Sequence, residues 1–180
     1  MAYEGVPGLV ETVEARGETT LVVDPARLLE ACTHLRDDGF AFLSDISAAD
    51  YLGWGERGVA GYIGTSAGRE LQPTGAQGHA RVPDPKPKRF SVSYHLLDMR
   101  GEARRVRLQV WLDDGQEIDS VVPVWPTADW HEREAWDLMG IRFRGHPNLE
   151  RLLLPEDWEG HPLRKDYPVG GEPVRFSGEQ

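Results

Sequence analysis

The side chains with the clearest chemical potential lie in GHPNLERLLLPEDWEGHPLRKDYP (145–168), where the triplet Gly-His-Pro occurs twice. The imidazoles of His146 and His161, with that of His131 upstream, are groups that bind metal ions or move protons. The triplet histidines are fifteen residues apart, which is not a spacing typical of paired metal ligands. One hypothesis is a stand-alone metal-dependent enzyme that uses these three histidines. The other is that the prolines fix the backbone and the imidazoles form hydrogen bonds to local backbone or to a neighbouring chain.

Other candidate chemistry in the chain is incomplete. The stretch His131-Glu132-Arg133-Glu134-Ala135 begins like the HExxH zinc signature, but Ala135 replaces the second histidine. The single cysteine, Cys32, excludes an internal disulfide framework and a Cys-rich zinc or iron–sulfur site. Cys32 falls on an apolar helical stripe, and the serines lie outside any nucleophile-elbow sequence. The sequence therefore predicts no catalytic, cofactor-binding or metal-binding residue in this chain.

Charges of both signs alternate closely around the histidines. A helix is predicted to carry Glu132, Arg133, Glu134 and Asp137, and the simplest interpretation of these charges is a solvated helix face. The segment after this helix is equally dense in arginines and acids. Because the arginine fork matches carboxylates, it suits a network of ion pairs, either within the chain or across an interface.

The overall composition limits the class of protein. The chain has 180 residues and a formal net charge of −10, which argues against binding to nucleic acid or to a membrane surface through a polybasic patch. No run of about 18 apolar residues occurs, so no membrane-spanning helix is predicted. The start, MAYEGVPGLVETVEARGE, lacks the basic and apolar regions of a signal peptide. We expect one domain with an appendage.

The first third of the chain predicts strand, helix, strand. Residues 20–23 form a β-branched apolar run, and Asp24 with Pro25 fits the start of a helix. An apolar stripe at i, i+3, i+4 and i+7 follows: Leu28, Ala31, Cys32 and Leu35. After Gly39, a buried strand is predicted with Phe40, Phe42 and Ile46 on its inner face. This order indicates a βαβ-like or split unit.

The middle of the chain predicts a long loop and then an antiparallel meander. Residues 52–88 carry many glycines and four prolines without any period, which indicates a surface loop. Alternating apolar residues then predict strands in RFSVSYHLLD (89–98) and VRLQVWL (106–112), and a third strand in EIDSVVPVWP (117–126).

The last part predicts one helix and an arm. The helix lies in PTADWHEREAWDLMGI (126–141), with a capping box of Asp129 and Glu132, and it ends at Gly140. Beyond it, we expect one helical turn around 149–154 and no sheet. The predicted organisation is an α+β domain of residues 1–140, with the loop at 52–88, and an extended partner-docking arm of residues 141–180.

The C-terminal motifs resemble those of one known family. They are Glu132-Arg133-Glu134 in a helix, Trp136-Asp137-Leu138-Met139-Gly140-Ile141, GHPNLER (145–151) and GHPLRKDYP (160–168). This order is similar to the signature of the 30 kDa subunit family (C-type subunits) of respiratory complex I. RFSVSYHLL and DISAADYL also resemble their family counterparts, so a weaker resemblance extends over residues 40–168. Met139 stands where an aromatic is usual, and the 52–88 segment is longer than the family linker.

The resemblance implies a non-catalytic, cofactor-free structural subunit in the peripheral arm of the proton-translocating NADH:quinone oxidoreductase, complex I. Such a subunit binds chiefly to the large quinone-site (D-type) subunit, beside other peripheral-arm subunits. It lies at the cytoplasmic face of the bacterial plasma (inner) membrane and touches the membrane only through the complex. The NADH, FMN, iron–sulfur clusters and quinone belong to other subunits. Equivalent scaffold subunits of membrane-bound hydrogenases and of ferredoxin- or F420-linked dehydrogenases remain alternatives.

On this interpretation, the twin Gly-His-Pro triplets are interface anchors. The predicted partner-docking and network residues are Glu132, Arg133, Glu134, Asp137, His146, Arg151, His161, Arg164, Lys165 and Asp166. The predicted fold class is α+β, with a small mixed β-sheet, packed helices and an extended C-terminal arm. The sheet combines the βαβ-like unit with the antiparallel meander.

Overall fold

The computed structural model describes residues 3–54, 84–101 and 103–168. Most of the loop predicted at 52–88, and the end of the predicted arm, lie outside these ranges. A mixed sheet has the strand order β1-β2-β5-β4-β3. Its strands are β1 Leu9–Ala15, β2 Glu18–Val23, β3 Phe42–Asp50, β4 Phe90–Asp98 and β5 Arg104–Leu112. The pair β2 and β5 is parallel, and the other neighbouring pairs are antiparallel.

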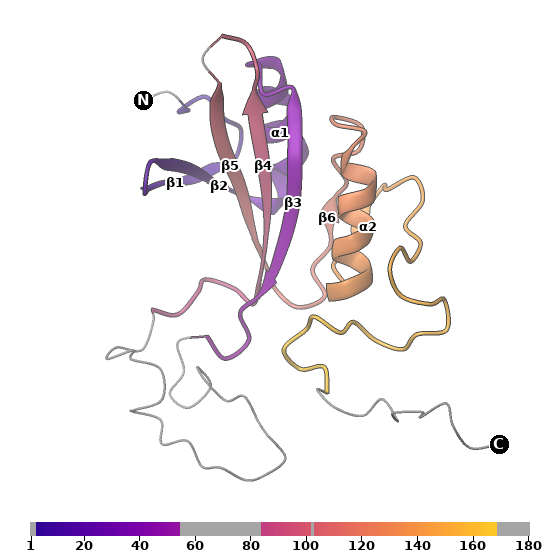
Figure 1. Cartoon of the computed structure of the whole chain (residues 1–180). Helices are drawn as coiled ribbons and strands as arrows, with labels where there is room; N and C mark the ends of the chain where they lie inside the picture. Colours follow the sequence, from indigo (N-terminus) through magenta and orange to yellow (C-terminus); the bar gives the residue numbers. More distant parts are fainter. Residues whose placement is uncertain (1–2, 55–83, 102, 169–180) are drawn as a thin grey trace, which may run out of the picture.

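The connection from β2 to β3 runs through helix α1 (Leu28–Asp37), which lies behind the sheet in Figure 1. Because β5 and β4 lie between β2 and β3 in the sheet, this is a split βαβ unit. The strands β3, β4 and β5 form an antiparallel meander. The predicted α+β fold class, with its βαβ-like unit and meander, is confirmed. Strand β1 was not predicted; it joins β2 through Arg16 and Gly17, both at positive φ.

The start of α1 follows the local sequence. The Asp24 carboxylate accepts a hydrogen bond of 2.9 Å from the Ala26 N–H, as an N-cap does. A 3₁₀ turn, η1 (Pro25–Arg27), leads into the helix. The predicted apolar stripe is buried against the sheet: Leu28, Ala31, Cys32 and Leu35.

The apolar residues predicted for β4 and β5 are buried in the core. The predicted alternation is confirmed in β5, whereas in β4 the polar residues Ser91 and Ser93 are buried as well. The strand predicted from Phe40 was wrong in its register. Phe40 is buried ahead of β3, but Phe42 is 49% exposed. Ile46 is buried as predicted, and Leu43 takes the inward position in place of Phe42. A register shift between Leu43 and Asp45 lets Leu43 and Ile46 face the same way, because the extra residue of a bulge moves the side chains after it to the opposite face.

The third meander strand predicted at 117–126 is also wrong. Only β6 (Ile118–Asp119) is extended there, and it pairs in parallel with β7 (Phe143–Arg144) in a separate two-stranded sheet. The chain then turns at Val121, whose carbonyl accepts from the N–H groups of Val124 and Trp125. This turn starts the approach to helix α2 (Ala128–Met139), which lies beside β3 in Figure 1.

Candidate docking site: helix α2 and the arm

Helix α2 buries charged side chains and exposes an apolar one, so the predicted solvated face is wrong. Glu132 and Asp137 have no exposed surface, whereas Trp130 is 60% exposed. The predicted capping box does not form, because the N-cap is Thr127 and Glu132 points inward. A helix with buried acids requires partners for each of them. Those partners come from the loop before the helix and from the arm, which is residues 141–180 and is described to Pro168.

Asp137 is the centre of the contact between α2 and the arm. Its Oδ2 accepts hydrogen bonds from three consecutive backbone N–H groups, at 3.0, 2.8 and 3.0 Å, from Leu152, Leu153 and Leu154. Its Oδ1 binds the Arg151 guanidinium at 2.6 Å. Successive backbone N–H groups that converge in this way form an anion-binding nest. The predicted helical turn at 149–154 is therefore absent, since its N–H groups bind Asp137.

The second Gly-His-Pro triplet caps the C-terminus of α2. The Nδ1 of His161 lies 2.8 Å from the Asp137 carbonyl oxygen, and the Leu163 N–H donates to the Leu138 carbonyl at 3.0 Å. Both carbonyls lie in the last turn, where no helical partner remains. Gly140 ends the helix at φ 75°, and a Cβ there would lie 2.7 Å from the His161 ring. Only glycine permits both this conformation and this approach.

The first Gly-His-Pro triplet contacts the opposite end of α2. The Nδ1 of His146 accepts from the Asn148 N–H at 3.0 Å, so its Nε2 carries the proton and donates to the Asp129 carbonyl at 3.2 Å. The two histidines thus bind carbonyls at positions 129 and 137, about 12 Å apart along the helix axis. The triplets hold the arm along the length of α2.

Glu132 lies in the interior of the protein, beneath the contact between the first Gly-His-Pro triplet and α2. Its Oε1 accepts from the Val121 N–H at 2.7 Å, and its Oε2 is buried without a hydrogen-bond partner among the described residues. The Nε2 of His146 is 3.9 Å from that oxygen. Burial raises the pKa of Glu132 to about 7, and the charge of Asp129 adds to this effect. The site therefore favours the protonated carboxyl more strongly than water does.

The pKa of Asp137 moves in the opposite direction. Burial alone would raise it, but the three backbone N–H groups and Arg151 outweigh burial and lower the pKa to about 2. The pKa values of two fully buried acids on one helix therefore move in opposite directions, because Asp137 has a full set of donors and Glu132 does not. Asp137 is the electrostatic anchor of the arm.

A second network ties the end of the described arm to the sheet. Arg89 binds Asp50 through two hydrogen bonds, of 3.1 and 2.9 Å, and its guanidinium also contacts Asp114 and Asp166. Arg164 binds both Asp114 oxygens, at 3.0 and 2.9 Å, and Asp166 at 3.1 Å. The guanidiniums of Arg164 and Arg89 lower the pKa of Asp166.

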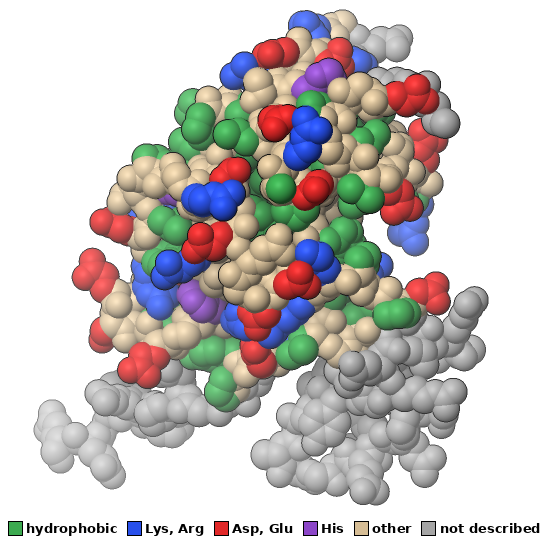
Figure 2. All heavy atoms as spheres, turned by 180° about the vertical axis from the view of Figure 1, so that it is seen from behind, with side chains coloured by type: hydrophobic (Ala, Val, Ile, Leu, Met, Phe, Trp, Pro, Cys, Tyr) green, Lys and Arg blue, Asp and Glu red, His purple; other side chains and the backbone are tan. Residues whose placement is uncertain are grey.

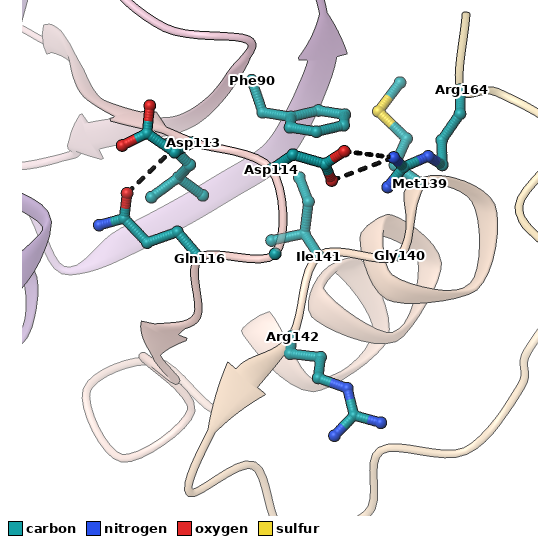
Figure 3. A pocket seen from close by; sticks show the side chains of 11 residues that line it. Phe90, Asp113, Asp114, Gln116, Met139, Gly140, Ile141, Arg142 and Arg164 are labelled. Carbon is teal, nitrogen blue, oxygen red and sulfur yellow. Dashed lines mark hydrogen bonds and ion pairs between the residues drawn. The ribbon is translucent and has the colours of Figure 1, made fainter. Parts of the chain in front are cut away.

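Figure 3 shows Arg164 reaching across from the arm to Asp114, above a hollow of about 220 Å³. The hollow lies between the turn after β5 and the end of α2, and its walls include Phe90, Met139 and Ile141. The Arg164 guanidinium also lies over the Phe90 ring, 5.2 Å from its centroid. The arm thus closes one side of this hollow through both charge and stacking.

The structure brings most predicted site residues into one intrachain arrangement. Arg133 donates to the Glu150 and Arg151 carbonyls, and the Lys165 backbone N–H donates to Asp50. The Glu134 side chain is exposed on α2. The ion pairs of the arm were predicted either within the chain or across an interface, and the described ones form within the chain. Contact of these residues with a partner stays a prediction.

Sequence reasoning missed Asp50, Arg89 and Asp114, which anchor the second network. Asp114 lies in the tight turn after β5, and Asp50 ends a strand, so each has an ordinary local explanation. The one signal in the sequence was the number of arginine and lysine residues in the arm, because these need acidic partners elsewhere in the chain. Nothing in the local sequence indicates that these three residues meet, because Arg89 is 39 positions from Asp50 and 25 from Asp114.

Large apolar side chains remain exposed on α2 and the arm, namely Trp130, Leu153 and Leu163. Over residues 3–54, 84–101 and 103–168, no group of three potential metal ligands occurs. Neither helix in that part of the chain has the length and apolarity to cross a membrane. On the face that carries α1, acidic and basic side chains are interspersed (Figure 2).

The family model and the curated relatives that match this chain point to the same family. The model of the family described as "Respiratory-chain NADH dehydrogenase, 30 Kd subunit" matches residues 21–173. Similar curated proteins are named as the C-type subunit of NADH-quinone oxidoreductase. That of Roseiflexus sp. (strain RS-1) is 38% identical over 96% of this chain and 82% of its own length. That of Saccharopolyspora erythraea is 41% identical over 98% of this chain and 60% of its own length.

The chain spans 60–62% of the length of the first curated relatives that it matches. Two solved structures are also similar. Nqo5, as a trypsin-resistant fragment (1–134), has a TM-score of 0.58 and 28% identity, covering 77% of this chain and 89% of that one. A chain of an archaeal membrane-bound sulfane sulfur reductase has a TM-score of 0.64 at 19% identity, covering 93% and 81%. The second likeness concerns the fold alone.

Proposed function

Because this chain belongs to the 30 kDa subunit family of the respiratory-chain NADH dehydrogenase, we propose that it is a structural subunit of the peripheral arm of complex I. In this role the chain itself is non-catalytic and binds no cofactor. NADH, FMN, iron–sulfur clusters and quinone are held by other subunits. The chain lies at the cytoplasmic face of the bacterial plasma membrane, and it reaches the membrane only through the complex.

The observation that carries this proposal is that the residues of the family motif form contacts within the chain. Its charged residues and histidines, such as Asp137, His146 and His161, fix the arm on α2. This leaves Trp130, Leu153 and Leu163 exposed at fixed positions on α2 and the arm. Exposed large apolar side chains held by a rigid frame are typical of the anchors of a protein interface.

The partner of this surface is the large quinone-site subunit of the complex. In this arrangement the chain holds the connecting module in register, so that electron transfer from NADH to quinone keeps its geometry. Electrons pass through the neighbouring chains. The exposed polar residues of the motif, Glu134 and Lys165, contribute at the rim of the contact, where charges set orientation more than affinity.

A photo-crosslinking amino acid at Leu163 tests the docking. Leu163 is 52% exposed, and its backbone is fixed by the hydrogen bond to Leu138. In native membranes we expect a cross-link to the quinone-site subunit from this position and none from Glu30, an exposed residue on α1. Cross-links from Leu163 only to other chains would contradict the proposed contact.

The same scaffold in a membrane-bound hydrogenase, or in a ferredoxin- or F420-linked dehydrogenase, is the second candidate. It differs in the electron donor rather than in the role of this chain. Assays of the purified assembly with NADH, hydrogen and reduced ferredoxin separate these cases, and we expect activity with NADH.

A stand-alone metal-dependent enzyme is the candidate from a different class. It requires His131, His146 and His161 to act as ligands together. The ring of His131 contacts Asp45 on β3, at 3.4 Å, while the other two histidines bind carbonyls at opposite ends of α2. This division of the three imidazoles favours the structural subunit.

A further inference from the structure

We propose that the outer edge of β1 is a second interaction surface, which adds a basic, β-branched strand from a neighbouring protein of the assembly to the sheet. This inference rests on the proposed function in one respect, since the neighbour belongs to the same assembly. It concerns the side of the sheet opposite α2, so it does not depend on the contact made by α2 and the arm.

The two edges of the sheet differ in how they are covered. The strand β3 forms one edge, and α2 packs beside it, with His131 of α2 contacting Asp45 of β3 (Figure 1). The strand β1 forms the other edge, and within the described part of the chain it pairs only with β2. An edge strand without cover presents a row of unpaired backbone N–H and C=O groups.

The side chains of β1 are exposed along almost its whole length. Six of its seven residues are exposed, and Val10 is 71% and Val13 39% accessible. Soluble proteins protect such edges with proline, with charged side chains, above all lysine, or with bulges. The β1 sequence, LVETVEA, has no proline or lysine; its charges are those of Glu11 and Glu14, and its bulge lies at one end, between Leu9 and Glu11. Among the described residues, none pairs with the outer side of the five positions beyond the bulge.

The charges of β1 define the chemistry of the added strand. The register places Glu11 and Val13 on the face of Val22 and Thr20, and Thr12 and Glu14 on the opposite face. A strand paired with β1 therefore meets a carboxylate on each face. Lysine or arginine opposite Glu11 and Glu14 would pair with the carboxylate on each face, and β-branched residues opposite Thr12 and Val13 would pack against them. This is peptide recognition by strand addition.

A second copy of this chain is the wrong occupant. The strand β1 carries Glu11 and Glu14 and no basic residue. A pair of two β1 strands therefore brings four carboxylates together without a cation. The net charge of −10 on each copy adds to this repulsion.

A photo-crosslinking amino acid at Val13, in the assembly extracted from native membranes, tests the proposal. We expect a cross-link to a lysine- or arginine-bearing strand of another protein of the assembly. Cross-links only to this chain, to a second copy or to nothing, while the Leu163 probe still reaches the quinone-site subunit, would overturn the strand addition and leave the proposed function intact. Failure at both positions would overturn both.

A charge-reversal pair supplies the matched control. We expect E11K/E14K to lower the Val13 cross-link yield about tenfold, because both ion pairs become repulsive. The variant E30K/D37K reverses two exposed acids of α1 by the same total charge, and those side chains are 59% and 65% exposed. This second variant keeps the full yield if pairing at β1 is specific. Equal loss in both variants would indicate nonspecific charge attraction and overturn the proposal.

Discussion

At the scale of single residues, the two buried acids of α2 define how the arm is held. Glu132 and Asp137 have no exposed surface, yet burial raises the pKa of one and the donors around the other lower its pKa. Sequence patterns identified both as candidates for an ion-pair network. Their burial was not predictable, because the residues that cover them lie in a segment without periodic structure.

Replacement of Asp137 by alanine tests the anchor. The change leaves Arg151 and three backbone N–H groups without their acceptor, so we expect a loss of about 3–5 kcal/mol in the free energy of unfolding. Urea denaturation of the full chain measures it. The control is Asp157→Ala, since Asp157 is exposed on the same arm, and it changes stability by less than about 0.5 kcal/mol. Equal effects of the two variants would contradict the anchor.

Arg164→Ala has a smaller expected effect than Asp137→Ala. The partners of Arg164, Asp114 and Asp166, are 49% and 44% exposed. Ion pairs with exposed acids contribute about 1 kcal/mol or less, and high salt weakens them. Unfolding at low and high ionic strength measures both properties. A salt-independent loss as large as that of Asp137→Ala would show that this network is not an exposed one.

Glu132→Gln removes a pH dependence. The folded pKa of Glu132 is about 7 and its ordinary value is 4.5. The stability that the protonated form contributes is thus complete below pH 4.5 and lost as pH rises through 7. That loss is about 3 kcal/mol in the natural chain and absent in the glutamine variant. Unfolding curves at pH 5 and pH 8 give the free energy of unfolding of the natural chain and of the glutamine variant. A difference between the two proteins that is the same at both pH values contradicts the raised pKa of Glu132.

At the scale of elements, local rules predicted the parts that local sequence controls. Asp24 and Pro25 start the first helix, Gly140 ends the second, and the alternation in β5 matches its burial. The failures have tertiary causes. Phe42 is exposed ahead of a bulge although Phe40 and Ile46 are buried as predicted, and the charged residues of β1 concealed an edge strand. The arm was expected on a partner, but its described part lies on α2.

Gly140→Ala tests the cap that the arm places on α2. Alanine there is strained at φ 75°, and its Cβ lies 2.7 Å from the His161 ring. Gly145→Ala is the matched control, because φ is 79° and no heavy atom lies within 4 Å of the added Cβ. Both changes cost about 1 kcal/mol for the backbone strain. We expect Gly140→Ala to cost more and to make the arm more sensitive to limited proteolysis, and equal effects would contradict the cap.

At the scale of the whole molecule, the described residues form one core and leave two kinds of surface that none of them covers. The apolar residues of α2 and the arm form one, and the outer edge of β1 forms the other. The net charge of −10 argued against nucleic-acid binding, and the motif order indicated the family. The anchors at Asp50 and Arg89 depend on contacts between distant segments, which composition and spacing do not encode.

The role proposed for this chain is that of a structural subunit of complex I. Native gel electrophoresis of the tagged chain, extracted from membranes of its own host in mild detergent, measures this membership without any variant. We predict that the chain migrates with a large assembly that contains the quinone-site subunit, oxidises NADH and reduces quinone. A small free species that carries one metal ion per chain would contradict this role.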